Sequence, residues 1–131
     1  MLIKIEGLPR PQQRHRHTKS GHTYDPSKKD KTPFIAKLLL HKPELPLSKS
    51  LMVGIVVSIP RPKSHYGTGK NEEKLKEGVQ SYPRGDVDNY AKFILDCMER
   101  AGFFYNDSQV VALQVMKEYG EPFTEIYIGE A

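Results

Sequence analysis

The stretch RGDVDNYAKFILDCMERAG, residues 84–102, decides how the rest of this sequence is interpreted. After Asp88, apolar residues recur at spacings of three and four, which is the pattern of a helix with one buried face. They are Tyr90, Ala91, Ile94, Leu95, Met98 and Ala101. Asp88 is a favourable cap for the start of such a helix, and Gly102 is a natural stop. The stretch therefore predicts an amphipathic helix over residues 88–101.

The flanking sequence predicts what this helix covers. Alternating or β-branched apolar residues predict strands over residues 1–9, 50–59, 108–119 and 123–128, the last as an antiparallel partner of the third. A first helix is predicted around residues 34–39, with Pro33 in its first turn and Pro43 ending the run. We therefore expect a single α+β domain over residues 1–131, with a small mixed or antiparallel sheet of about four strands and two main helices on one face.

Two polar segments lie outside these elements. Residues 10–24 carry four Lys/Arg and three His without apolar periodicity, so we expect an exposed basic loop. Residues 61–85 form a long polar connection, and connections of this length are usually functional or mobile. Within it, a short helix is expected around residues 72–76.

Cysteine content and hydropathy narrow the class of protein. Cys97 is the only cysteine, so an intrachain disulfide and a four-cysteine zinc site are excluded, and a buried small residue is the simplest role for it. The longest apolar run, residues 51–59, is too short to cross a bilayer. The first residues lack the apolar stretch of a secretory signal, so we expect a cytoplasmic protein.

Charge is divided unevenly along the chain. Residues 1–85 hold 17 Lys/Arg against 7 Asp/Glu, whereas residues 86–131 hold 3 against 9, so balances of +10 and −6 make up the net charge of +4. A basic part suits a polyanion such as nucleic acid, and clustered Asp residues suit a hard cation. A dipolar surface without such a purpose explains the charges about as well.

Three aspartates are the candidate metal ligands: Asp86, Asp88 and Asp107. Each has a simpler explanation, because Asp88 can be a helix cap and Asp107 lies in the turn sequence Asn-Asp-Ser. A helix over residues 88–101 is about 20 Å long at 1.5 Å per residue. Asp107 can therefore return to the start of the helix only if the chain reverses tightly at Gly102. Otherwise the helix is shorter, or Asp107 serves a different protomer.

Lys92 lies one helical turn after Asp88. An ordinary ion pair between them is one interpretation, and contact of Lys92 with a scissile phosphate is the other. Asp96, a further turn along, is too far from Asp88 to share a metal, so a supporting role, such as pairing with Lys92, is expected.

Several other motifs fail or are weak. An EF-hand loop starting at Asp86 would need other residues at positions 90, 91 and 97, and neither a P-loop nor a GxGxxG motif is present. The HRH at residues 15–17 lacks further zinc ligands and lies among arginines, which favours phosphate contact or solvation. Residues 103–105, FFY, are expected to fill the core, although an exposed aromatic residue there could wedge into DNA.

The region from Arg84 to Gly120 resembles the RusA family of Holliday junction resolvases. That family has the core DxDN-x-x-K-x-x-x-D, followed by D-S-Q and by K-x-Y at the end of a strand. The matching residues are Asp86, Asp88, Asn89, Lys92, Asp96, Asp107, Ser108, Gln109, Lys117 and Tyr119. The early element G-x-P-x-x-x-x-R-x-R is similar to Gly7, Pro9, Arg14 and Arg16, and RPKSHY at 61–66 is similar to the middle segment. Asn106 departs from the second Asp that many relatives carry.

The resemblance implies a small homodimer, often prophage-encoded, that cuts four-way DNA junctions in recombination and repair with a divalent metal. The metal is usually Mg²⁺, and we expect Mn²⁺ to substitute. It implies Asp86, Asp88 and Asp107 as metal ligands and catalytic residues, Lys92 as the functional lysine, and Asn89 and Asp96 in support. Phosphates flanking the cut are expected to bind Arg10, Arg14, Arg16, Lys19 and Lys63.

Three other functions stay open at this point. A nuclease with broader selectivity, acting on flaps or duplex, has the same sequence features. A non-catalytic DNA-binding module would tolerate replacement of all three aspartates, although bare carboxylates repel DNA. A phage structural or adaptor protein would bind no junction at all.

Overall fold

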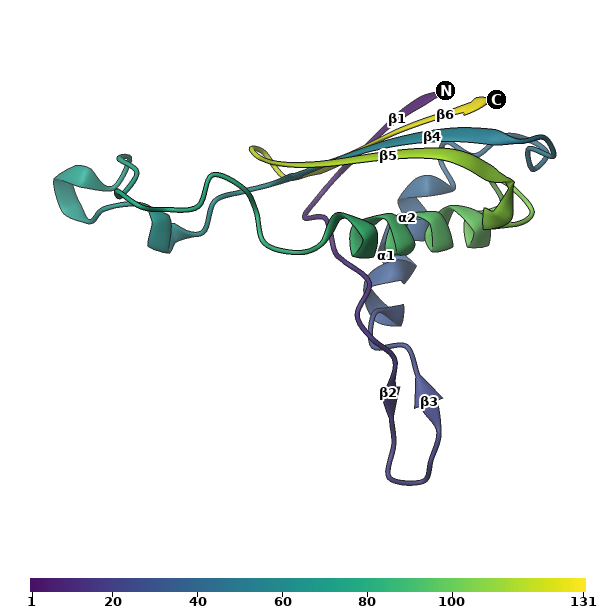
Figure 1. Ribbon diagram of the computed structural model, residues 1–131, viewed down its shortest axis with the longest axis horizontal. Coiled ribbons are helices and arrows are strands. Elements are labelled where there is room, and N and C mark those ends of the chain that lie inside the picture. The colour runs from purple at the N-terminus through teal and green to yellow at the C-terminus, as the bar shows by residue number, and fades with distance from the viewer.

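The structure is a computed structural model that describes residues 1–131. Its main sheet has four strands in the order β1-β6-β4-β5: β1 (Leu2–Glu6), β6 (Phe123–Glu130), β4 (Leu51–Ile59) and β5 (Val110–Tyr119). Two helices, α1 (Lys28–Leu38) and α2 (Val87–Ala101), lie on the same side of this sheet (Figure 1). The predicted α+β arrangement is confirmed. No helix combines the length and apolar character that a bilayer crossing requires.

The central position of β4 follows from its composition. Apart from Ser58, its side chains are apolar on both faces, and it pairs with β5 in parallel and with β6 in antiparallel orientation. The predicted antiparallel pairing of the last two strands is therefore wrong, because β4 lies between them. Residue alternation along the strands places Ile3, Val53, Ile55, Val57 and Ile126 on the face that the helices cover, where they join the core.

Helix α2 supplies the other half of that core. Phe93, Ile94, Cys97 and Met98 are each no more than 2% exposed. Gly102 ends the helix with a left-handed φ of 90°, a conformation that favours glycine, and so confirms the predicted stop. Phe103 and Phe104 then enter the core as predicted, whereas Tyr105 is 65% exposed and does not.

Helix α1 begins earlier than predicted. It starts at Lys28, so Pro33 lies inside the helix instead of in its first turn. Proline removes one helical hydrogen bond there. The first turns are nevertheless held against α2, because Lys31 is buried between the helices and paired with aspartates on both sides.

Two segments project from the body (Figure 1). The basic segment forms a short hairpin, β2 (Arg16–His17) with β3 (Thr23–Tyr24), instead of a loop without structure. The connection between β4 and α2 carries two 3-10 turns, η1 (Lys63–His65) and η2 (Gly69–Asn71), and no helix at residues 72–76 as had been expected. Figure 1 shows α2 beginning where both projections leave the body.

Candidate active site

The first turn of α2 carries two of the candidate carboxylates. The helix begins at Val87, so Asp86 occupies the capping position that was predicted for Asp88, and Asp88 lies inside the first turn. The Asp86 side chain makes no capping hydrogen bond, and both residues are exposed. Helix capping therefore explains neither carboxylate, although both benefit from the positive end of the helix dipole.

The backbone just before Asp86 is held in place by two contacts. Gly85 adopts a positive φ of 94°, and a Cβ at this position would come within 2.9 Å of the Tyr90 ring, so glycine is required twice over. Lys117 Nζ donates a hydrogen bond of 2.6 Å to the Gly85 carbonyl oxygen. These contacts direct Asp86 and Asp88 toward solvent from a fixed segment.

The third carboxylate, Asp107, lies in a 3-10 turn, η3 (Asp107–Gln109), beside the last turns of α2. Its backbone N–H donates to Glu99 Oε1 at 3.2 Å. Asn106 caps the turn by accepting a hydrogen bond of 2.8 Å from the Ser108 N–H. The Asn that departs from the family pattern thus has a structural role, and the Asp107 carboxylate itself stays exposed.

Gln109 fixes this turn to the body of the protein. Its Oε1 accepts from the backbone N–H groups of residues 105 and 106 at 2.9 and 3.0 Å. Its Nε2 donates to the carbonyl oxygens of Leu47 and Lys49 at 2.9 and 3.0 Å. Two acceptor and two donor contacts use the amide fully. This gives the D-S-Q element a physical reason: Gln109 holds Asp107 in position.

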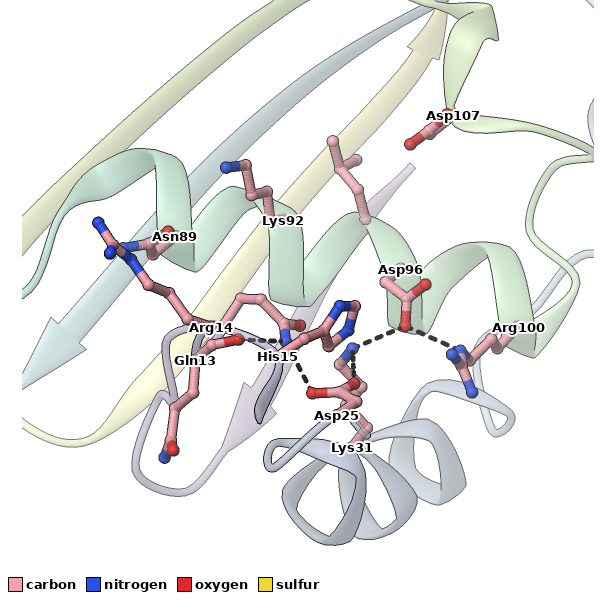
Figure 2. A pocket seen from close by; sticks show the side chains of 12 residues that line it. Gln13, Arg14, His15, Asp25, Lys31, Asn89, Lys92, Asp96, Arg100 and Asp107 are labelled. Atoms are coloured by element: carbon pink, nitrogen blue, oxygen red, sulfur yellow. Dashed lines mark hydrogen bonds and ion pairs between the residues drawn. The ribbon is translucent and has the colours of Figure 1, made fainter. Parts of the chain in front are cut away.

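An open cavity of about 470 Å³ runs along the exposed face of α2 (Figure 2). Asn89, Lys92, Asp96 and Arg100 line it from the helix, and Asp107 lines it from the turn beyond. The other lining residues are Gln12, Gln13, Arg14, His15, Asp25, Lys31 and Leu95. The fold thus brings Lys92 and Asp107 to one cavity, whereas Asp86 and Asp88 lie outside its lining.

The three candidate carboxylates are donor groups of the kind that bind a divalent metal. Asp86, Asp88 and Asp107 are exposed and take part in none of the four ion pairs, and carboxylate oxygens are the donors that Mg²⁺ prefers. No group of three or more His, Cys, Asp or Glu side chains in this chain is close enough together to hold a metal ion. The donor chemistry fits, and the assignment of all three as ligands of one site stays a prediction.

Lys31 forms the buried centre of an ion-pair network at the opposite edge of the cavity. It is 4% exposed, and its Nζ lies 2.7 Å from Asp25 Oδ2 and 3.0 Å from Asp96 Oδ2. Arg100 Nε approaches the same Asp96 oxygen at 2.8 Å. Figure 2 shows the chain of contacts from Asp25 through Lys31 and Asp96 to Arg100. The network joins the basic segment, α1 and α2.

The network shifts the pKa values of its members. Burial raises the pKa of Asp25, but hydrogen bonds from Lys31, Ser27 and Gln12 outweigh burial and lower the pKa from 3.8 to about 2. Burial lowers the pKa of Lys31, and its contacts with Asp25 and Asp96 reverse this and raise it. Asp25 and Lys31 are therefore both charged at neutral pH.

The structure corrects the expected partner of Asp96. Asp96 pairs with Lys31 and Arg100 and not with Lys92. Lys92 is exposed and forms no ion pair, so the expected alternative of a pair with Asp88 is absent as well. Lys92 thus projects a free ammonium group into the cavity.

The expected phosphate-binding residues occupy four places. Arg14 lines the cavity, and Arg16 and Lys19 lie on the β2–β3 hairpin. Lys63 lies in η1, and Arg10 lines a second pocket near the start of α2. All five are exposed. The segment that carries the four of them before residue 20 is held to α2, because Gln12 N–H donates to the Asn89 carbonyl oxygen at 2.9 Å.

Sequence reasoning missed Asp25, Lys31 and Glu99 and gave no role to Gln109 or Lys117. A lysine and an aspartate six residues apart in a basic segment carry no signal of burial. For Gln109 and Lys117 a signal existed, since both belong to the quoted motifs. Cys97 was interpreted correctly: it is fully buried, and burial raises the pKa of its thiol to about 12.

The family model for endodeoxyribonuclease RusA matches residues 6–129. A protein of Bacillus subtilis (strain 168), "Uncharacterized protein YqaN", is 36% identical over 92 residues, which is 69% of this chain. The chain spans 64% of the length of that relative. The match over residues 6–129 shows that the chain belongs to the RusA family of endodeoxyribonucleases.

Proposed function

We propose that this chain is a Mg²⁺-dependent endodeoxyribonuclease that resolves four-way DNA junctions by paired, symmetric cuts. The observation that carries the proposal is that Asp86, Asp88 and Asp107 are exposed and free of ion pairs, and that the free ammonium group of Lys92 enters the cavity that Asp107 also lines. Unpaired carboxylates on a basic protein repel DNA unless a cation joins them. Membership of the RusA family supports the same activity.

Each residue has a chemical task in this proposal. Asp86, Asp88 and Asp107 would hold the metal, which when bound lowers the pKa of water and offsets charge on the phosphate. Lys92 donates to a non-bridging phosphate oxygen, where negative charge grows as the bond breaks. Arg14 and the two basic projections hold neighbouring phosphates and so fix the scissile bond over α2.

A homodimer is part of the proposal, because two symmetric cuts need two active sites. A junction has near two-fold symmetry, which a C₂ dimer matches. The sheet offers surface for a second copy: its face away from the helices carries Met52, Met116 and Tyr127, which are 41%, 51% and 49% exposed. Apolar side chains gathered in this way are typical of a protein interface.

The deciding experiment compares substrates and metals. Labelled mobile four-way junction and matched linear duplex are incubated with the protein in Mg²⁺, in Mn²⁺ and in EDTA, and the mass of the protein is measured by light scattering. We expect paired nicks in the junction alone, in either metal, from a dimer. Cutting of both substrates would instead indicate a nuclease of broad selectivity. Tight binding without cutting in any divalent metal would indicate a DNA-binding module.

Variants separate the site from the fold. Asp88→Asn should bind the junction and lose cleavage by at least about 10²-fold, since it removes a proposed metal ligand. Asp30→Asn is the matched control, because Asp30 lies on α1, outside the cavity, and should keep cleavage. Cleavage by Asp88→Asn at the wild-type rate would contradict the metal-ligand assignment.

A further inference from the structure

A second pocket, of about 470 Å³, lies beside the start of α2. Residues 8–11, 59–62 and 83–84 form its walls, together with His65, Tyr90 and Tyr119. We call it the proline pocket, since five of these lining residues are prolines. It adjoins the candidate site along the chain: Arg84 stands two residues before Asp86, and Tyr90 two residues after Asp88. Its volume lies within the range of small-ligand sites.

The pocket is built from segments that are held in place. Arg61 Nη1 donates to the Gln80 carbonyl oxygen at 2.9 Å, which ties the two ends of the long connection together. The Lys117 bond to Gly85 holds the segment before α2, and the Tyr90 hydroxyl donates to the Arg84 carbonyl oxygen at 3.4 Å. The prolines restrict the backbone of the walls further. The shape of the pocket therefore does not depend on a ligand.

Positively charged side chains surround a flat aromatic ring in this pocket. Arg10, Arg61 and Arg84 line it, none of them forms an ion pair, and no Asp or Glu is among the lining residues. The Arg61 guanidinium lies 4.0 Å from the centre of the Tyr119 ring, and His65 meets the same ring edge-on at 5.8 Å. A ligand that suits this pocket carries negative charge and a flat, stackable group, and a nucleotide has both.

We propose that the proline pocket binds one unstacked nucleotide of the DNA strand that passes Asp86 and Asp88, with its base against the Arg61–Tyr119 stack and its phosphate at Arg10 and Arg84. This assignment rests on the proposed function, because that function makes DNA, and not a free mononucleotide, the source of the nucleotide. The bases at the centre of a junction are the easiest to unstack, so the pocket favours junctions over duplex. It also gives Lys117 and Tyr119 of the K-x-Y motif a role in building the pocket.

The test couples a change in the protein with a change in the DNA. Single abasic sites are placed in turn at each nucleotide near the cleavage position, and junction affinity is measured in EDTA for the full chain and for Tyr119→Leu. We expect one position at which loss of the base weakens wild-type binding about 10-fold, in keeping with the strength of base stacking on aromatic side chains. Tyr119→Leu should bind the intact junction about 10-fold more weakly and be insensitive to the abasic site at that position.

Two further variants keep the result interpretable. Leu40→Ala changes a large apolar side chain that is 83% exposed, lies just past the end of α1 and lines neither pocket, and it should keep the full response to the abasic site. Arg61→Gln removes the guanidinium and should lose the response as Tyr119→Leu does, so the test does not depend on the folding of one variant. The proposal is overturned if the abasic site weakens the junction affinity of Tyr119→Leu and of Arg61→Gln by the same factor as it weakens that of the wild type.

Failure of the pocket and failure of the proposed function give different results. Metal-dependent junction cutting with additive pocket effects would leave the function standing and remove the pocket. If the protein neither binds nor cuts DNA, the proposed function fails, and titration with deoxynucleoside monophosphates decides on the pocket. Binding that Tyr119→Leu abolishes would then support a nucleotide site, and absence of binding would overturn it.

Discussion

Two sets of aspartates, one member of each on α2, differ in their partners. Asp25 and Asp96 are only partly exposed, and each lies within 3.0 Å of Lys31 Nζ. The side chains of the second set are exposed to solvent and have no cation within ion-pairing distance; this set is Asp86, Asp88 and Asp107. The first set holds the basic segment and the two helices together. The second set contributes nothing comparable to the fold.

The difference separates stability from function. A protein gains little stability from three unpaired carboxylates at the surface, and neighbouring carboxylates repel one another. Their positions are nevertheless held by specific contacts, through Lys117 and Gly85 at one end and through Gln109 at the other. Precise placement of groups without a structural partner is what a ligand or metal site requires. Changes in the paired set should therefore lower the stability of the protein, and changes in the unpaired set should lower its activity and leave its stability nearly unchanged.

The largest effect on stability is expected for Lys31→Met. This change leaves Asp25 and Asp96 near each other without their shared cation, and breaking a buried ion pair costs about 3 kcal/mol. We expect the free energy of unfolding, measured in urea, to fall by about that amount. Lys29→Met, on the exposed side of the same helix, should change it by less than about 0.5 kcal/mol. Equal effects of the two variants would show that the network does not hold the helices.

A smaller effect is expected on acidification. The pKa of Asp25 is lowered on folding from 3.8 to about 2, so its contribution is complete above about pH 4 and is lost as the pH falls toward 2. The size of the shift corresponds to about 2 kcal/mol. The free energy of unfolding is measured in urea at pH 5 and at pH 2.5 for the wild type and for Asp25→Asn. Between these pH values the variant should lose less of it than the wild type does, and the difference should be most of the roughly 2 kcal/mol that the pKa shift represents.

Lys29→Met again serves as the control for acidification, because it leaves every contact of Asp25 in place. It should lose stability on acidification as the wild type does. An Asp25→Asn protein that loses as much stability as the wild type would show that Asp25 is not protonated on unfolding in this range.

The smallest stability effect is expected in the unpaired set. Asp88→Asn and Asp107→Asn should each change the free energy of unfolding by less than about 0.5 kcal/mol, because neither carboxylate has a side-chain partner to lose. Asp96→Asn, the matched change in the paired set, should cost more, since Lys31 and Arg100 would then face a neutral group. Thermal unfolding of the three variants side by side measures this contrast. It fails if Asp107→Asn is as destabilising as Asp96→Asn.

Local pattern was a good guide where one element decides its own structure. The apolar stripe from Tyr90 to Ala101 predicted α2, and Gly102 predicted its end. It was a poor guide where partners are distant. The sequence placed Pro33 in the first turn of α1, but the helix begins at Lys28, and the buried Lys31 holds its first turns against α2. Nothing in the sequence indicates that Lys31 is buried. The last two strands were paired because they are neighbours in sequence, but β4 lies between them.

The sequence by itself determined α2, the four strands of the main sheet, the charge division and the residue types of the candidate site, because periodicity and motif spacing are local properties of the chain. Only the tertiary structure decided which charges are neutralised. Lys31 meets Asp96 across 65 positions of sequence because two helices pack on one face of a sheet, and no local pattern encodes that packing. For the same reason, the tertiary structure alone placed Asp107 in one cavity with Lys92 and built the proline pocket from four separate parts of the chain.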